Sequence, residues 1–296
     1  MSGTVVSSAS DANKGAWRPL RPEAAGSLVD TRLQLHHAVQ LATALGISYL
    51  PKQADDSHTN LMWVDSLSAL VSNAVPGRDE IRIGVSLAPF ALVLLVNDGP
   101  RANLSLDGRT IAEAADWIRD HLAMLGLDAA KYTLAKHYTI PEHRVDGGAP
   151  FNASNAEAFE QLAAWYSDAS IVLEEFVARM PHAAPVRCWP HHFDIATIIE
   201  LAPGKTISLG MEPGDVYYSE PYYYASAYPR PRLDLERPPL AGNGVWHTHE
   251  WIGAVLRASA IRAPEQRGQI EAFVESAITA TTALLANSSR TDESLS

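Results

Sequence analysis

The chain has 296 residues, of which 47% are hydrophobic and 19% charged, and its formal net charge is −11 at pH 7. This composition is typical of a globular protein with a substantial core and excludes a disordered chain. Phosphate binding needs a basic surface, so the negative charge argues against a nucleic acid as partner. A single cysteine, Cys188, excludes an intramolecular disulfide, and we expect a cytoplasmic protein.

No segment of the sequence predicts a membrane helix or a signal peptide. The longest apolar run, residues 83–96, covers about 14 residues and contains Pro89, whereas a membrane helix needs roughly 20. Residues 1–16 are mostly small and polar, without the charged and apolar regions of a signal peptide. We expect residues 1–16 and 287–296 to be mobile tails, because neither has an apolar period.

Residues 17–146 predict a first half of the protein in the order helix, strands, helix. Apolar residues at helical spacing predict the first helix over residues 30–45. Thr110 and Glu113 have the spacing of a capping box and predict the start of the last helix. Runs rich in Val, Leu and Ile predict the strands, over residues 61–75, 81–87 and 91–96.

The same order returns in residues 151–286, after a linker predicted at the Gly-Gly-Ala-Pro run 147–150. A helix is predicted over residues 156–180. The predicted strands follow over residues 186–201, 206–210 and 216–227. Two helices are predicted at the end, over residues 248–261 and 264–285.

The repeated order favours an internal duplication. His58 and His191 follow the first helix of their half at similar distances, although such an order also recurs by accident in α+β proteins. We therefore predict an α/β or α+β fold. It has two similar helix-strands-helix halves, each with a mixed or antiparallel sheet, packed as one body.

Four of the 11 histidines fall in two tight pairs within the second half. His191 and His192 open a predicted strand, in which alternation places His192 and Asp194 on one face. His247 and His249 lie in Trp-His-Thr-His-Glu-Trp, at the predicted start of a helix, and share a face if the backbone there is extended. Folding would have to bring the two pairs together across about 55 residues.

These pairs allow two kinds of site. Three imidazoles and a carboxylate suit zinc, iron or manganese, with the predicted ligands His192, Asp194, His247 and His249. In the metal-free alternative, Asp194 orients His192 as a general base, and the second pair caps or satisfies the helix start.

Residues 212–224 hold five of the ten tyrosines. We expect Tyr218, Tyr222 and Tyr224 to share a strand face and to offer phenol donors to a small molecule, although a packed aromatic strand would have the same pattern. Trp246 is a further predicted ligand-binding residue. Glu220 lies near the start of this otherwise aromatic strand, where a carboxylate is either at the rim of the sheet or buried with a partner. We expect catalysis to involve Glu220, Asp194 and His192.

Other catalytic signatures are missing from the sequence. It contains no Gly-x-Ser-x-Gly elbow, Walker loop or Gly-x-Gly-x-x-Gly fingerprint, which argues against serine hydrolases of that type, nucleoside triphosphatases and Rossmann enzymes. Cys188 is expected to be a buried, inert thiol.

The block from Trp189 to Leu256 resembles an uncharacterised bacterial family, a domain of unknown function. Its members carry similar motifs, which here are Phe193-Asp194-Ile195-Ala196, Pro213-Gly214-Asp215, Glu220-Pro221-Tyr222-Tyr223 and Trp246-His247-Thr248. The first half fits more loosely, through residues 58–63 and the strands after them. The resemblance implies no activity.

From the residues we expect a small-molecule enzyme, a metal-assisted hydrolase or lyase, with its site in the second half. The alternative is a non-catalytic small-molecule-binding or structural protein that uses the same pocket of tyrosines and histidines. Neither reading involves a nucleic acid or a membrane, and the sequence leaves the oligomeric state open.

Overall fold

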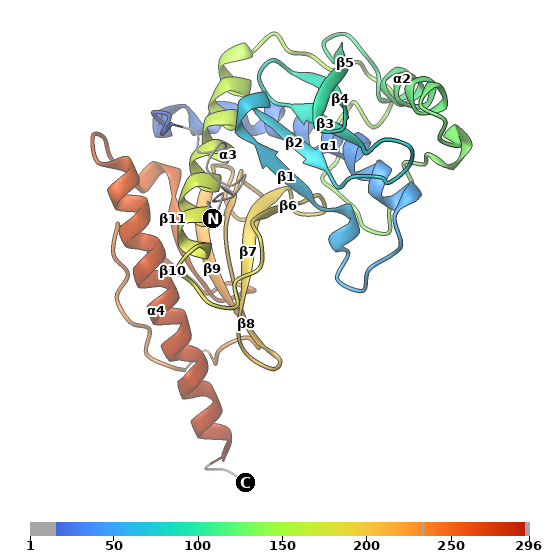
Figure 1. The fold of residues 1–296 in the computed structure, drawn as a ribbon. Coiled ribbons are helices and arrows are strands. Elements are labelled where there is room, and N and C mark those ends of the chain that lie inside the picture. Colours follow the sequence, from blue (N-terminus) through green and yellow to red (C-terminus); the bar gives the residue numbers. More distant parts are fainter. Residues whose placement is uncertain (1–15, 233, 294–296) are drawn as a thin grey trace, which may run out of the picture.

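The structure is a computed structural model that describes residues 16–232 and 234–293. These residues form an α+β body of four α-helices and one open, antiparallel sheet of 11 strands (Figure 1). The helices are α1 (Val29–Tyr49), α2 (Ile111–Met124), α3 (Ala156–Val177) and α4 (Gln266–Glu293). The strands are β1 (Leu61–Val64), β2 (Ala69–Ser72), β3 (Ile81–Ser86), β4 (Ala91–Val96), β5 (Gly99–Ser105), β6 (Arg187–Trp189), β7 (Asp194–Ala202), β8 (Lys205–Glu212), β9 (Tyr222–Tyr228), β10 (Val245–His247) and β11 (Gly253–Arg257).

The sheet is continuous across both predicted halves. Its strand order is β10-β11-β9-β8-β7-β6-β1-β2-β3-β4-β5, and the halves join where Leu61 of β1 lies opposite Cys188 of β6. The prediction had two separate sheets, which would leave the backbone groups of β1 and of β6 unpaired at a sheet edge. The pairing of β1 with β6 covers both of these edges. The prediction of one packed body is confirmed, whereas the duplication stays a prediction.

Three helices pack on one face of the sheet, and α2 packs against α1. Helix α1 lies on β2 and β3, α3 on β1, β7 and β8, and α4 on β8, β9 and β11. Alternate strand residues that face these helices belong to the main core, for example Leu70, Val85, Ile195, Met211 and Tyr223. Side chains between these positions point to the opposite face. There β2 and β4 carry a small apolar cluster, and β6 to β9 carry polar residues.

Several predicted elements are confirmed. Helices α1 and α3 cover the predicted ranges closely, and the capping box at the start of α2 is complete, with Thr110 and Glu113 each accepting the other's backbone N–H. The predicted strand over residues 61–75 is instead two strands, because the chain turns at Ser68, whose φ is 45°. The strand β5 was not predicted, since its sequence is mostly exposed and lacks an apolar run.

The predicted helix over residues 248–261 is wrong, and so is the helix start proposed for His247. This segment contains β11, between β10 and β9. Ala254, Val255 and Leu256 are all buried, and a strand buried on both faces has the continuous apolar run that a buried helix also has. Likewise, the strand predicted over residues 216–227 begins only at Tyr222.

Tails were predicted at both ends of the chain. Apart from Ala16, the predicted N-terminal tail lies outside the described residues. Helix α4 continues to Glu293, into the range predicted as a C-terminal tail. No helix in the described part of the chain is long and apolar enough to cross a membrane.

Candidate functional site

Buried acids meet where three neighbouring strands have their ends. Asp194 begins β7 and Glu212 ends β8, and Glu212 lies opposite Tyr222, the first residue of β9. Because Ile195 pairs with Met211, Asp194 and Glu212 are the next opposed pair. Opposed residues of antiparallel strands have Cβ atoms about 5 Å apart on the same face. The two carboxyls therefore adjoin on the face that carries no helices.

Both carboxyls are deeply buried, with 5% of Asp194 and 6% of Glu212 exposed. Tyr224 donates its hydroxyl to Asp194 Oδ2 at 2.5 Å, whereas Oδ1 is buried without a partner among the described residues. Burial raises the pKa of Asp194 and, more strongly, that of Glu212. The negative charges of Asp194 and Asp215 raise the pKa of Glu212 further. Two adjacent carboxylates repel each other, so the pair keeps a shared proton to a higher pH than either acid would in water.

Arg32, in the first turn of α1, brings a cation to the acid pair. It is 8% exposed, and its Nη1 is buried with no partner among the described residues. Burial lowers the pKa of this guanidinium, and the charges of Glu212 and Asp215 oppose that effect. A Cβ on Gly214, whose φ is 115°, would lie 2.3 Å from Nη1. Glycine thus allows the guanidinium to rest against the loop after β8.

The three predicted tyrosines do come together, although Tyr218 lies in the loop before β9 and not on the strand. The ring centres are 5.0 Å apart for Tyr218 and Tyr222, and 6.3 Å for Tyr222 and Tyr224. Tyr222 donates to Asp215 Oδ2 at 2.9 Å, while Asp215 Oδ1 accepts two backbone N–H groups of the loop. Burial raises the pKa of Tyr222 and of Tyr224, which keeps both hydroxyls protonated as donors.

His247 extends this aromatic group. Its Nδ1 lies 2.8 Å from the Tyr218 hydroxyl and its Nε2 lies 2.5 Å from the carbonyl oxygen of His249. A carbonyl only accepts, so Nε2 carries the proton and Nδ1 accepts from Tyr218. The indole of Trp251 stacks on the imidazole at 4.4 Å. Both ring nitrogens of His247 are therefore occupied.

The four predicted metal ligands are not grouped. His192 is exposed in the turn before β7, and Phe193 has a φ of 68°, so strand alternation does not reach His192. A positive charge on His192 would still lower the pKa of the nearby Asp194. His249 is exposed as well. Within the described ranges, no three His, Cys, Asp or Glu side chains are arranged to hold a metal ion, and the metal site stays a prediction.

Glu220 and Trp246 have other partners. Glu220 accepts the backbone N–H of Ser259 at 2.6 Å and its hydroxyl at 2.9 Å, with Arg257 4.0 Å away. These contacts tie the loop before β9 to the turn after β11. Trp246 donates its indole N–H to the carbonyl of Pro238. The tryptophan that joins the tyrosines is Trp251.

Sequence reasoning missed Arg32, Glu212 and Asp215. Arg32 could have been noticed because Leu28 and Leu35, one turn away on either side, are both apolar. Glu212 ends a run of apolar strand residues directly before the Pro213-Gly214 turn, where a buried acid at a strand end is a useful signal.

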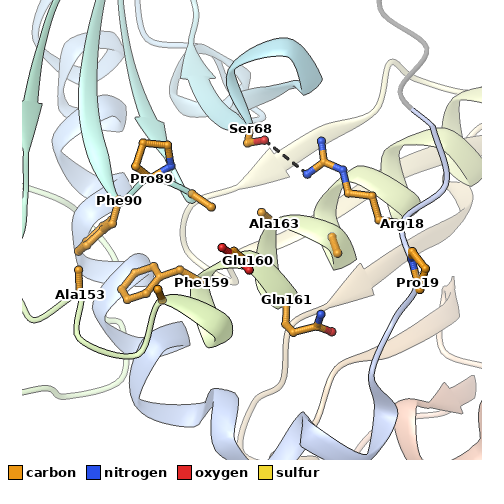
Figure 2. Close-up of a pocket in the computed structure, with 13 residues that line it drawn as sticks. Arg18, Pro19, Ser68, Pro89, Phe90, Ala153, Phe159, Glu160, Gln161 and Ala163 are labelled. Atoms are coloured by element: carbon orange, nitrogen blue, oxygen red, sulfur yellow. Dashed lines mark hydrogen bonds between the residues drawn. The ribbon is translucent and has the colours of Figure 1, made fainter.

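A separate cavity of about 650 Å³ lies between the segment at Arg18, the turn at Pro89 and α3 (Figure 2). Arg18 and Glu160 are its charged lining residues, and Arg18 is already paired with Asp65 at 3.0 Å. The remaining lining is mostly alanine, proline and phenylalanine. This cavity therefore offers little chemistry beyond apolar contact.

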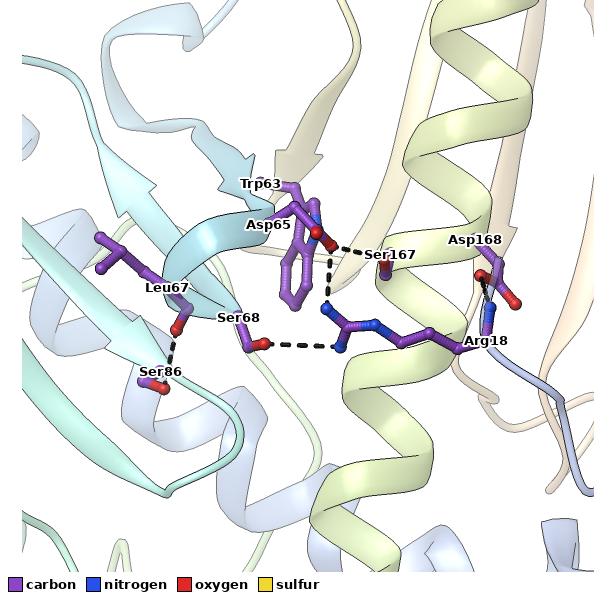
Figure 3. A network of polar contacts seen from close by, with 8 residues as sticks. All are labelled: Arg18, Trp63, Asp65, Leu67, Ser68, Ser86, Ser167 and Asp168. Carbon is purple, nitrogen blue, oxygen red and sulfur yellow. Dashed lines mark hydrogen bonds and ion pairs between the residues drawn. The ribbon is translucent and has the colours of Figure 1, made fainter. Parts of the chain in front are cut away.

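The polar network beside that cavity holds the two halves together (Figure 3). Asp65 Oδ1 accepts the Ser167 hydroxyl at 2.5 Å as well as the Arg18 guanidinium. The backbone N–H of Arg18 donates to Asp168 Oδ1 at 2.9 Å. Asp168 is fully buried, its Oδ2 has no described partner, and burial raises its pKa to about 7.

Comparison with known proteins identifies neither a family nor a function for the chain. No family model, no curated protein and no solved structure matches the chain. The resemblance to an uncharacterised bacterial family thus stays a prediction, and any functional proposal rests on the site itself.

Proposed function

We propose that the chain is a small-molecule enzyme that uses Asp194 and Glu212 as an acid–base pair. One observation supports this best: Asp194 Oδ1 and Arg32 Nη1 are both buried and both lack a partner among the described residues. Leaving such a group unsatisfied costs about 1–3 kcal/mol. A substrate group that donates to Asp194 and accepts from Arg32 would satisfy both.

Each buried group has a distinct role in the proposed chemistry. The carboxyl that holds the shared proton donates it to the leaving group, and its ionised partner takes a proton from water in a hydrolysis or from carbon in an elimination. Arg32 stabilises negative charge that develops on the substrate. Tyr224 fixes the orientation of Asp194 through its hydroxyl. Both a hydrolase and a lyase are compatible with this arrangement.

The charge of the cluster limits what reacts there. With one shared proton, Asp194 and Glu212 together carry one negative charge, Asp215 adds a second, and Arg32 offsets one of them. A negatively charged reacting group would meet net repulsion. The proposal therefore predicts that the bond broken belongs to a neutral or positively charged part of the substrate.

Turnover of a panel of chromogenic esters, amides and glycosides tests this proposal. Any activity found should fall about 100-fold or more in Asp194→Asn and in Glu212→Gln, the usual size of a general acid or base contribution. Glu200→Gln is the matched control, because Glu200 is an exposed acid on the same strand as Asp194. Activity that survives both buried substitutions in folded protein would refute the proposal.

A non-catalytic binding protein is the second candidate. It is favoured by the aromatic group of Tyr217, Tyr218, His247 and Trp251, whose rings contact one another. In that case a ligand would raise the melting temperature of the wild type and of Asp194→Asn equally, and none of the panel would be turned over.

A further inference from the structure

A cavity of about 460 Å³ lies at the seam where β1 pairs with β6. Trp189 and Arg187 of β6 both line it. Trp189 is the cross-strand partner of Asp194, and Arg187 is that of Ala196. Opposed residues in an antiparallel pair point to the same face. Trp189 in the cavity wall and Asp194 of the acid pair therefore adjoin on the same face of the sheet.

Arg187 is a half-buried cation in this cavity wall. Burial lowers the pKa of its guanidinium, and the charge of Glu174 on α3 opposes that effect, although no described acid lies within ion-pair distance of Arg187. Its Nη1 donates to the carbonyl of Val186 at 2.7 Å, which leaves the other guanidinium nitrogens for a ligand. Partial burial of a charge is unfavourable unless a counter-charge is supplied. An anionic group in the cavity would supply a counter-charge in direct contact with the guanidinium, which Glu174 does not.

The opposite wall adds further donors. His58 Nδ1 accepts the backbone N–H of Gln53 at 3.3 Å, so Nε2 is the nitrogen that carries the proton. A Cβ on Gly46 would lie 2.1 Å from the His58 carbonyl oxygen, which shows how closely this loop is held against α1. Asn60, only 6% exposed, also lines the cavity. Asp55 is the one acid in the lining, and its carboxylate accepts the Ser57 N–H.

Trp189 gives the cavity an aromatic wall. Its side chain is half-buried, and its ring meets that of His191 edge to face at 6.2 Å. A flat ring in the cavity would stack on the indole, and 460 Å³ lies within the usual range for small-molecule sites.

We infer that this cavity binds a molecule that has a flat ring and an anionic group, with the ring on Trp189 and the anion, a carboxylate or a phosphate, at Arg187 and His58. The binding claim stands by itself. Only its extension rests on the proposed function: because Trp189 in the cavity wall is opposed to Asp194, the bound molecule is the substrate, held by its anionic end with its neutral part directed toward the acid pair.

Calorimetric titration at low salt tests the inference with two matched pairs of probes. Benzoate is compared with benzamide, and adenosine monophosphate with adenosine, so that each pair shares a ring and differs in the anion. We expect saturable binding of at least one anionic probe, and at least about tenfold weaker binding of its neutral partner, the size of a charge-assisted hydrogen bond. Whichever anion binds identifies the group that the cavity takes.

Substitutions then locate the site. Arg187→Met should weaken binding of the anionic probe about tenfold or more, and Arg187→Lys should restore part of it. Arg101→Met removes the same charge from exposed β5 and should leave binding unchanged. No saturable binding of either anion, equal affinity for a neutral partner, or full affinity in Arg187→Met would overturn the inference. If Arg187→Met does not fold, the comparison of each anionic probe with its neutral partner on the wild type still tests the inference.

The two proposals can fail separately. Asp194→Asn should retain the affinity for the anionic probe, because Asp194 does not line the cavity. Binding without turnover of any substrate would overturn the proposed function and leave the anion site standing. Turnover with no binding of either anionic probe would overturn the anion site and leave the acid pair standing.

Discussion

Asp168 couples the stability of the protein to pH. It is fully buried on α3, and burial raises its pKa from 3.8 to about 7. Since the folded pKa is the higher one, the folded chain binds this proton more tightly than the unfolded chain does. The contribution to stability is fully present below about pH 4 and is lost as the pH rises toward 7. A difference of about three units corresponds to roughly 4 kcal/mol.

Replacement of Asp168 by asparagine removes this dependence. The free energy of unfolding of Asp168→Asn, minus that of the wild type, should rise by about 1.4 kcal/mol per pH unit between pH 4 and 7 and then level off. The new amide N–H₂ would replace Oδ2, which has no described partner, at a cost of about 1–3 kcal/mol. The substitution would therefore leave a net gain of only about 1–3 kcal/mol at alkaline pH.

Urea denaturation of both proteins across this pH range is the assay, and the slope of the difference is the decisive quantity. Other buried acids, such as Glu212, change both proteins alike and cancel. Asp120→Asn is the control, because Asp120 is exposed on α2, and its difference from the wild type should be flat. A flat difference for Asp168→Asn would refute the reasoning.

Three further predictions concern the site. Gly214→Ala should lower the free energy of unfolding by about 1–3 kcal/mol, because the alanine Cβ would clash with Arg32 Nη1 and because alanine disfavours the positive φ of this position. Equal denaturation midpoints for the variant and the wild type would contradict this. Glu220→Gln should cost about 1 kcal/mol through its bonds to Ser259 and should leave turnover intact, whereas lost turnover in stable protein would restore Glu220 as a catalytic residue. Elemental analysis of protein purified without a histidine tag should find zinc, iron and manganese substoichiometric, since both ring nitrogens of His247 are occupied; a ratio near one that falls in His247→Ala would support the metal site instead.

The sequence by itself determined the elements whose signals are local. Helix α2 begins at Thr110 because its capping box needs only residues three apart, and α1 and α3 follow from apolar spacing. The same local reading located Asp194 and the tyrosines in one segment of the chain. It could not identify β11, because a buried strand and a buried helix share a continuous apolar run.

Only the tertiary structure decided which groups meet. Arg32 acts electrostatically on Glu212 from a distant part of the chain, and Trp189 becomes the neighbour of Asp194 through a turn whose Phe193 has a positive φ. Periodicity reports whether a side chain is buried, but not which distant side chain shares its surroundings. The pKa of a buried acid depends on those surroundings. The acid pair, its arginine and the adjoining cavity therefore became visible only once the strands were paired.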